Sequence, residues 1–388
     1  MAHADFPLEE EHEMIRSAVR EFVTGELAPR ARELDETASF PVEIFAEYAE
    51  NGMLGIPFPE EYGGGDGDAL GFLLSVIEVA RACGSTAVTL VEHVGFAAWP
   101  LYRLGTKAQC EAWLEAMLSG EGLGSLAHNE RRVGESLSHL RTHAAAQGND
   151  AFALTGEKSF VLNAGRPGPM LVSAHTGSEP RRDSVHLFVL SKQGEADANV
   201  RMGERYETMG VRAADVRDIT FDAANVTRDG WLGEAPVAAA QLEEALALGQ
   251  LGLTAVAIGL VESALAESAE YAQARRQFDQ PIGDFPAIRF RIAEMQLGLD
   301  ASKALLFEGA RRIAAGEPVA PLAASARITA AQVAEKATYD AIQVYGGNGY
   351  SREYPLQRYW RDAKVISLVH GSLEAQRFRL AAHAMPEQ

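Results

Sequence analysis

Residues Tyr339–Arg377 read YDAIQVYGGNGYSREYPLQRYWRDAKVISLVHGSLEAQR, and this stretch decides the fold. Apolar residues at helical spacing run up to Tyr345, after which Gly346, Gly347 and Gly349 fall within four positions. Glycines in such number end a helix and let the backbone approach a ligand closely. Backbone N–H groups in a turn of this kind suit phosphate oxygens. The stretch therefore predicts a helix that ends in a phosphate-binding turn, with a plain turn as the alternative.

The stretch resembles the C-terminal signature of the acyl-CoA dehydrogenase family, in which a helix ends in Q-x-x-G-G-x-G-[FY] and an R-D pair follows. Gln343 stands three residues before the first glycine, and Arg361 and Asp362 supply the R-D pair. The resemblance implies FAD as the cofactor, with Gln343, Gly346 and Gly347 at its pyrophosphate.

The chain departs from the family where the catalytic base belongs. Most members carry a glutamate in a Y-E-G-T tetrapeptide, and this chain has Val369–Ser372, VHGS, at that place. A subset carries the glutamate just before the arginine of a D-x-x-R motif, where this chain has Gly249. Ala247 and Gln250 replace the aspartate and arginine of that motif. Neither of the two positions at which the family carries its glutamate holds a glutamate in this chain.

Two residues are candidates for the missing base. His370 stands in the glutamate's position, and histidine is a common proton acceptor near neutral pH; a packed or solvated helix-end histidine is the alternative. Glu92 lies on a helix that forms the floor of the acyl pocket in relatives, and a solvated surface glutamate is the alternative there. Glu243 and Glu244, upstream of Gly249, are expected to form a solvated face.

A second motif points to a cofactor shared between subunits. Arg275, Gln277 and Phe278 resemble the family's R-x-[TQ]-F, which reaches across a dimer interface to the FAD of a neighbouring subunit. An arginine can pair with phosphate and a phenylalanine can pack on a flat ring. A basic helix end that complements the helix dipole is the alternative. If the motif works as in the family, the protein is a homo-oligomer, a dimer or tetramer, with a hetero-oligomer also open.

The residues expected at the flavin ring are partly replaced. The family's T-E-P-x-x-G-S-D run is here Asn129–Ser136, NERRVGES, which leaves Asn129 to line the flavin. In the strand K-x-W-I-[TS]-N, Phe160 stands in place of the tryptophan and can still pack on the flavin ring. Leu162 stands in place of the hydroxyl residue and has no side-chain donor. The expected cofactor contacts are completed by Ser372, in the threonine's place, and Glu374, where some members have a flavin-contacting glutamine.

Periodicity divides the chain into three parts. Helical spacing runs from about residue 8 to 123, for example over Thr86–Leu104 and Lys107–Leu118, with a Gly- and Pro-rich loop at Gly52–Gly67. Alternation then predicts strands, and helices return from about Pro236. The predicted strands are Phe152–Thr155, Lys158–Leu162, Met170–Ala174, His186–Ser191 and Asp218–Phe221. The predicted class is α+β, with an N-terminal helical domain at 1–123, a middle β domain (barrel or sandwich) at 124–233 and a C-terminal four-helix bundle at 234–388, the last two named from the resemblance.

Composition narrows the partners. A net charge of −19 disfavours nucleic acid and anionic lipid. Two cysteines provide neither a disulfide framework nor a cysteine metal cluster. The most apolar run, Leu246–Val261, is interrupted by glycines and polar residues and is predicted to be a buried helix rather than a membrane span. The acidic first residues are unlike a signal peptide, which predicts a cytoplasmic protein.

The resemblance implies an FAD-dependent oxidoreductase that introduces an α,β double bond into an acyl thioester, carried on CoA or on an acyl-carrier protein. An electron-transfer flavoprotein is then the expected electron acceptor. Two alternatives follow from the replaced residues. One is a non-catalytic FAD-binding subunit. The other is a member with a different flavin reaction, such as a desulfination, an elimination or an oxygenation.

Overall fold

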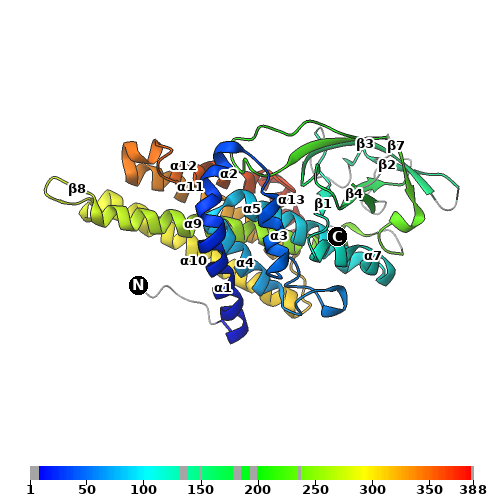
Figure 1. The fold of residues 1–388 in the computed structure, drawn as a ribbon, viewed down its shortest axis with the longest axis horizontal. Helices are drawn as coiled ribbons and strands as arrows, with labels where there is room; N and C mark the ends of the chain where they lie inside the picture. Colours follow the sequence, from blue (N-terminus) through cyan, green and yellow to red (C-terminus); the bar gives the residue numbers. More distant parts are fainter. Residues whose placement is uncertain are drawn as a thin grey trace.

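The computed structural model describes residues 8–131, 139–148, 151–177, 185–192, 199–234 and 237–385. Helical regions come before and after a single large sheet in the chain, as Figure 1 shows. The α, then β, then α order predicted from periodicity is confirmed. The predicted domain boundaries stay a prediction.

Helices α1 and α5 and the segment η1 pack against the buried helix α4. The helix predicted over Lys107–Leu118 is confirmed with the same ends, as α7. The helix predicted over Thr86–Leu104 is instead α5, a π-helical segment η3 and α6. Such π-helical turns occur often at functional sites. The bounds are α1 Glu10–Phe22, η1 Val23–Leu27, α2 Ala28–Thr37, α3 Val42–Glu50, α4 Ala69–Ala82, α5 Gly84–Val91, η3 Glu92–Ala98, α6 Trp99–Leu104 and α7 Lys107–Leu118.

The middle of the chain forms a seven-stranded mixed sheet in the order β1-β4-β2-β3-β7-β6, with β5 also paired to β4. The strands predicted over Phe152–Thr155 and Lys158–Leu162 form one strand, because the register shifts at Gly156 instead of breaking the strand. The short strands β1, β2 and β6 were not predicted. The bounds are β1 Ser125–Ala127, β2 His143–Ala146, β3 Ala151–Leu162, β4 Pro169–His175, β5 Val185–Ser191, β6 Val200–Met202 and β7 Val216–Thr227.

Strand β1 lies at the edge of the sheet, where it meets the helices. It pairs with β4 on one side only. Two alternate N–H groups along it donate to neighbouring residues of η3: Leu126 to Glu92 Oε1 at 2.6 Å and Gly124 to His93 Nδ1 at 2.8 Å. Because burial lowers the pKa of His93 to about 4, its ring is neutral and accepts this bond. Glu92 and His93 thus fasten the helical region to the sheet.

The C-terminal helices form a bundle in which α9, α10 and α11 pack against one another. Residues Ala239–Ala274 are long and apolar enough to cross a membrane, yet 94% of their apolar window is buried inside the protein, as in a core helix. Leu246–Val261 is therefore buried, as predicted. The bounds are α8 Ala239–Ala245, α9 Ala247–Ala274, β8 Arg276–Gln277, β9 Gln280–Pro281, α10 Pro286–Ala314, α11 Ala320–Tyr345, η7 Gly346–Tyr350, α12 Leu356–Ala363, η8 Lys364–Ser367 and α13 Leu373–Ala384.

The R-D pair joins all three parts of the chain. Arg361 forms an ion pair with Asp35 at 2.5 Å and donates to the carbonyl of Met209 at 3.0 Å. Asp362 accepts the N–H of Val211 at 2.6 Å. Burial raises the pKa of Asp362 to about 6. In the sequence this pair supported a flavin site, and in the structure it holds α12 to the N-terminal helices and to the middle of the chain.

Candidate active site

The two candidate bases, 278 residues apart in the chain, are in direct contact. His370 Nε2 and Glu92 Oε2 form a short hydrogen bond, and both side chains are buried. Phe96 packs over the imidazole with ring centroids 3.9 Å apart. The expectation of a solvated surface glutamate at Glu92 is wrong, because Glu92 is fully buried between η3, β1 and the turn at His370.

A buried arginine holds the turn that carries the imidazole. Arg327 of α11 donates to the carbonyl oxygens of Ile366, Val369, His370 and Gly371, and to Gln250 Oε1 at 2.6 Å. Gln250 in turn donates to the His370 carbonyl at 3.1 Å. With these contacts His370 adopts φ +46°, a conformation that L-residues rarely take. Gln250 therefore helps to position His370.

A lysine lies near the carboxylate from the side of the sheet. Lys192 donates to the carbonyls of Leu123 and Asn163, each at 2.8 Å, and to Ser125 Oγ at 3.1 Å. Burial lowers the pKa of Lys192 to about 7, while the negative charge of Glu92 acts in the opposite direction. The pair of Glu92 and His370 thus has Lys192 as a third ionisable neighbour, which no sequence pattern indicated.

The residues predicted at the flavin ring lie on the sheet. Asn129 accepts the N–H of Ser159 at 2.9 Å, which places it next to Phe160. Phe160 stacks on Tyr206 with centroids 4.7 Å apart and keeps 44% of its surface exposed. Among the described residues nothing bonds the buried Asn129 Oδ1. A half-exposed aromatic face beside an unsatisfied amide oxygen fits a flat, hydrogen-bonding ring. The rest of the run, residues 132–136, lies outside the described residues.

The residues predicted at the pyrophosphate lie elsewhere, at the far end of α9 and α11. Helix α11 ends at Tyr345, and Gly346 follows with φ +59°. No atom lies within 4 Å of where a Cβ would stand at Gly346 or Gly347, so the turn leaves room for a ligand. Gln343 is exposed beside it. The phosphate-binding turn predicted from the sequence has the backbone it needs.

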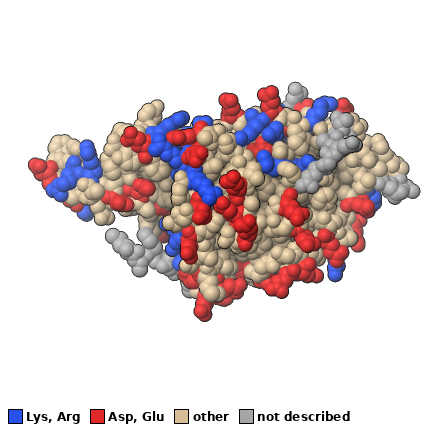
Figure 2. All heavy atoms as spheres, viewed as in Figure 1, with Lys and Arg blue, Asp and Glu red and all other residues tan. Residues whose placement is uncertain are grey.

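The R-x-Q-F residues form a hairpin that projects from the end of α9 in Figure 1. Arg275 and Gln277 are exposed, and Phe278 is 88% exposed. Figure 2 shows a group of basic side chains at this tip, in a molecule whose net charge is −19. An exposed aromatic ring beside exposed arginines suits a ligand that this part of the chain does not itself enclose.

The two remaining residues predicted at the cofactor, Ser372 and Glu374, bond to neighbouring residues of the chain. Ser372 caps α13 by accepting the N–H of Ala375 at 3.2 Å. Glu374 lies on the surface and pairs with Arg377 at 3.0 Å.

The expectation of a solvated face at Glu243 and Glu244 is wrong. Glu244 accepts the N–H groups of Val319 and Ala320 at the start of α11, and Glu243 lies 3.6 Å from Arg379.

Two polar residues near the turn at His370 were missed. His128 and Gln376 are both buried, and each has a side-chain nitrogen that no described residue bonds. His128 directly precedes Asn129, and Gln376 lies one helical turn after Ser372. Both adjoin predicted site residues in the sequence, but only burial without a partner sets them apart.

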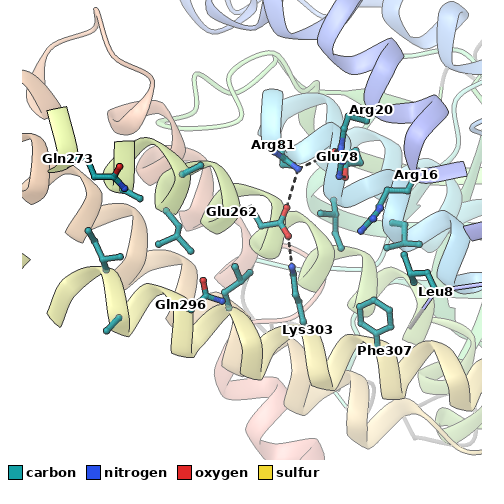
Figure 3. A pocket seen from close by; sticks show the side chains of 18 of the residues that line it. Leu8, Arg16, Arg20, Glu78, Arg81, Glu262, Gln273, Gln296, Lys303 and Phe307 are labelled. Atoms are coloured by element: carbon teal, nitrogen blue, oxygen red, sulfur yellow. Dashed lines mark hydrogen bonds and ion pairs between the residues drawn. The ribbon is translucent and has the colours of Figure 1, made fainter. Parts of the chain in front are cut away.

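A separate cavity of about 740 Å³ lies between α1, α4, α9 and α10, and none of the predicted site residues line it. Its charges largely satisfy one another. Figure 3 shows Glu262 between Arg81 and Lys303, at 3.6 and 2.7 Å, and Arg20 pairs with Glu78 at 2.5 Å. This cavity is not the candidate active site.

Fold and site together define the class of protein, an oxidoreductase with a β sheet between two helical regions. Comparisons with known proteins identify its family. The chain matches the acyl-CoA dehydrogenase N-terminal domain over residues 9–121, the middle domain over 125–224 and the C-terminal domain over 239–385. The chain belongs to the acyl-CoA dehydrogenase family, whose members are FAD-dependent.

Individual relatives agree. The probable acyl-CoA dehydrogenase YngJ of Bacillus subtilis is 34% identical over 97% of this chain and 98% of its own length. The short-chain specific acyl-CoA dehydrogenase of Clostridium acetobutylicum is 31% identical over 96% of this chain and 97% of its own length. The structure of butyryl-CoA dehydrogenase from Megasphaera elsdenii superposes with a TM-score of 0.93, at 30% identity, covering 98% of this chain and all of that one.

Proposed function

We propose that this flavoprotein dehydrogenates an acyl thioester with His370 as the base and Glu92 as the residue that orients it. The observation that carries the proposal is the buried contact between His370 Nε2 and Glu92 Oε2. In this proposal a histidine takes the place of the family's glutamate, and the Glu92 carboxylate holds that histidine in position.

The hydrogen bonds assign the tautomer of His370. Glu92 Oε1 accepts the N–H of Leu126, and a carboxylate can only accept at Oε2 as well. His370 Nε2 must therefore carry the proton in this bond. In the neutral ring the lone pair is then on Nδ1, and no described residue bonds that atom. His370 Nδ1 is the proton acceptor, and Glu92 selects it.

FAD, when bound, would supply the acceptor for the hydride of the β-carbon, and His370 Nδ1 would take the α-proton. Asn129 and Phe160 would contact the ring, while Gly346, Gly347 and Gln343 would contact the diphosphate. Leu162 provides no side-chain donor, so the hydroxyl contact expected in the family is absent from that strand position. A positioned base contributes about 100- to 10,000-fold to such a rate.

The distance between the two groups of cofactor residues supports an oligomer. Gln250 touches the His370 turn near the start of α9, and Arg275 follows its end, 25 residues later. At 1.5 Å per residue the two are about 38 Å apart, which is longer than an extended dinucleotide. Asn348 donates to Tyr271 at 3.0 Å, so the glycine turn lies near the same end as Arg275. The phosphate-binding residues would then serve the FAD of another subunit.

A short acyl-CoA substrate is supported by the named activities of the relatives. An acyl-carrier thioester as substrate, an electron-transfer flavoprotein as acceptor and a cytoplasmic location stay predictions.

The test is the visible spectrum of the purified protein, recorded anaerobically while it is mixed with acyl-CoAs of different chain length. Bleaching of the flavin band by one of them is expected. His370→Ala should slow this bleaching about 100- to 10,000-fold with FAD content unchanged. Unchanged bleaching in the variant would remove His370 from the mechanism. A yellow wild-type protein that no thioester bleaches would point to a non-catalytic subunit or another flavin reaction.

A further inference from the structure

The cavity between α1, α4, α9 and α10 has the features of a ligand site of its own. Its volume of about 740 Å³ is ordinary for sites that bind small molecules. Such sites combine an apolar lining with a few polar groups that fix the position of the ligand. The described residues that line this cavity provide both.

A row of five charged side chains crosses the cavity from α1 to α10. Arg20 pairs with Glu78 at 2.5 Å, and Glu78 also lies 3.4 Å from Arg81. Glu262 then lies 3.6 Å from Arg81 and 2.7 Å from Lys303, as Figure 3 shows. This charged row alternates in sign and has a cation at each end. It therefore carries one more positive charge than negative charges.

The carboxylates of the charged row are occupied, whereas its cations keep N–H groups to donate. Both oxygens of Glu78 and both oxygens of Glu262 already lie beside a cation. Arg20 donates to Glu78 through Nε and Nη2, and no described residue accepts from its Nη1. The Lys303 ammonium has three N–H groups, and Glu262 is its one ion-pair partner among the described residues. One added carboxylate would balance the charge and accept these donors.

The other charged residues that line the cavity leave this balance unchanged. Arg16 and Arg289 are paired with Glu13 at 2.7 Å and with Asp284 at 3.2 Å. The excess positive charge of the charged row therefore remains. In a chain with a net charge of −19, such a local excess favours the entry of an anion at this place.

An apolar trench continues from the charged row between α9 and α10. On α9, Ala266 and Ala269 follow the row at helical spacing, and on α10 Ile292 and Ala293 precede it. One hairpin joins the two helices, so these residues lie on the same side of the row. The alanines are small and leave the space between the helices open. Gln273 lines the far end of this alanine trench, 11 residues beyond the row, so the trench is about 16 Å long at 1.5 Å per residue.

We propose that this cavity binds a fatty acid, with its carboxylate at Arg20, Arg81 and Lys303 and its chain in the alanine trench. The proposal goes beyond the proposed function and does not depend on it. An anionic membrane surface presents similar chemistry, but the net negative charge of the chain opposes its approach. A single acid molecule inside the cavity meets the positive charge of the row. Bound there, it would hold α1 and α4 to α9 and α10 and stabilise the folded protein.

The test is a calorimetric titration of the FAD-loaded protein with dodecanoate. Saturable binding is expected, together with a rise in the melting temperature. Lys303→Met removes one cation of the row and keeps an apolar stem, so it should weaken binding about 10- to 100-fold. Ala266→Phe keeps every charge and fills the trench, so it should abolish binding. Because Ala266 is exposed, this second variant should fold as the wild type does.

Lys336→Met is the matched control. Lys336 pairs with Asp340 on α11 and is not among the residues that line the cavity. This variant should bind dodecanoate with wild-type affinity. Two further probes separate the parts of the ligand. Dodecan-1-ol has the chain without the charge, acetate has the charge without the chain, and each should bind far more weakly than dodecanoate.

Three results would overturn the proposal. Wild-type affinity for dodecanoate in both Lys303→Met and Ala266→Phe would mean that the acid binds elsewhere, for example in the acyl site. Binding to phosphatidylglycerol vesicles without binding of free dodecanoate would make the cavity a membrane contact. If free dodecanoate does not bind and Ala266→Phe forms a smaller oligomer in size-exclusion chromatography, the cavity is covered by a second copy of the chain.

Discussion

The two ends of α9 differ in how much of their chemistry one chain completes. Near its start, Gln250, Arg327, His370 and Glu92 form a closed, buried network in which nearly every polar atom has a partner. Near its end, Arg275 and Phe278 project from the molecule, and the turn at Gly346 has open space around it. At this end, residues that match the family motif have room for a ligand from outside the chain. Near the start, Gln250 and His370, which depart from the motif, contact each other inside the protein.

Beyond the removal of His370 itself, the largest effect on activity is expected near the start of α9. Glu92→Gln would turn an N–H group of the amide toward His370 Nε2, because its oxygen is needed by Leu126. The imidazole would then carry its proton on Nδ1 and would no longer accept the α-proton. We expect flavin reduction to slow roughly 100-fold with FAD retained.

Glu78→Gln is the matched control for this change. Glu78 is also buried among the N-terminal helices, where it pairs with Arg20 and Arg81. Its exchange should lower the melting temperature without a matching loss in the rate of flavin reduction. Equal rate losses in both variants would mean that Glu92 acts only on stability.

At the other end of α9, a substitution should weaken FAD binding. Arg275→Ala removes an exposed guanidinium that would form a charge-assisted bond with phosphate, so FAD should bind about 10- to 100-fold more weakly. Fluorescence titration of the apoprotein with FAD measures this. Arg311 is exposed on α10 and pairs with Glu308 and Glu317, and Arg311→Ala should leave FAD affinity unchanged. Full FAD affinity in the Arg275 variant would contradict a cofactor shared between subunits.

A third effect concerns the stability of the fold, and not the rate or FAD affinity, at the R-D pair. Because burial raises the pKa of Asp362 to about 6, the folded protein binds a proton there more tightly than the unfolded chain does. Stability from this group is full below the unfolded pKa near 4 and is lost as pH rises through 6. Asp362→Asn, which keeps an acceptor for Val211, should therefore stabilise the protein at pH 8 by up to about 3 kcal/mol, and not at pH 4.

Melting curves at the two pH values test this prediction. Asp340→Asn is the comparison, since Asp340 forms ion pairs with Arg291 and Lys336 and its exchange should destabilise the protein at pH 8. A loss of stability at pH 8 in the Asp362 variant would show that its charged form is favourable where it lies.

Local patterns predicted the fold well where the cause is local. A run of apolar residues with a Thr cap gave α7 its ends, and consecutive glycines gave the end of α11. They failed where distant residues decide. Nothing around Glu244 shows that it caps α11, and nothing around Glu92 names a partner 278 residues away. The sequence could show that a base was missing and which residues were candidates. It could not show that the two candidates act together.

The fastening of β1 has a consequence for solubility. An uncovered strand edge is a template on which other chains pair and aggregate. Glu92 and His93 cover the outer N–H groups of Leu126 and Gly124, so the same glutamate that orients His370 also prevents the sheet from growing through β1. Substitutions at position 92 therefore act on two traits at once, and a variant selected for a new reaction there must also keep the edge of the sheet closed.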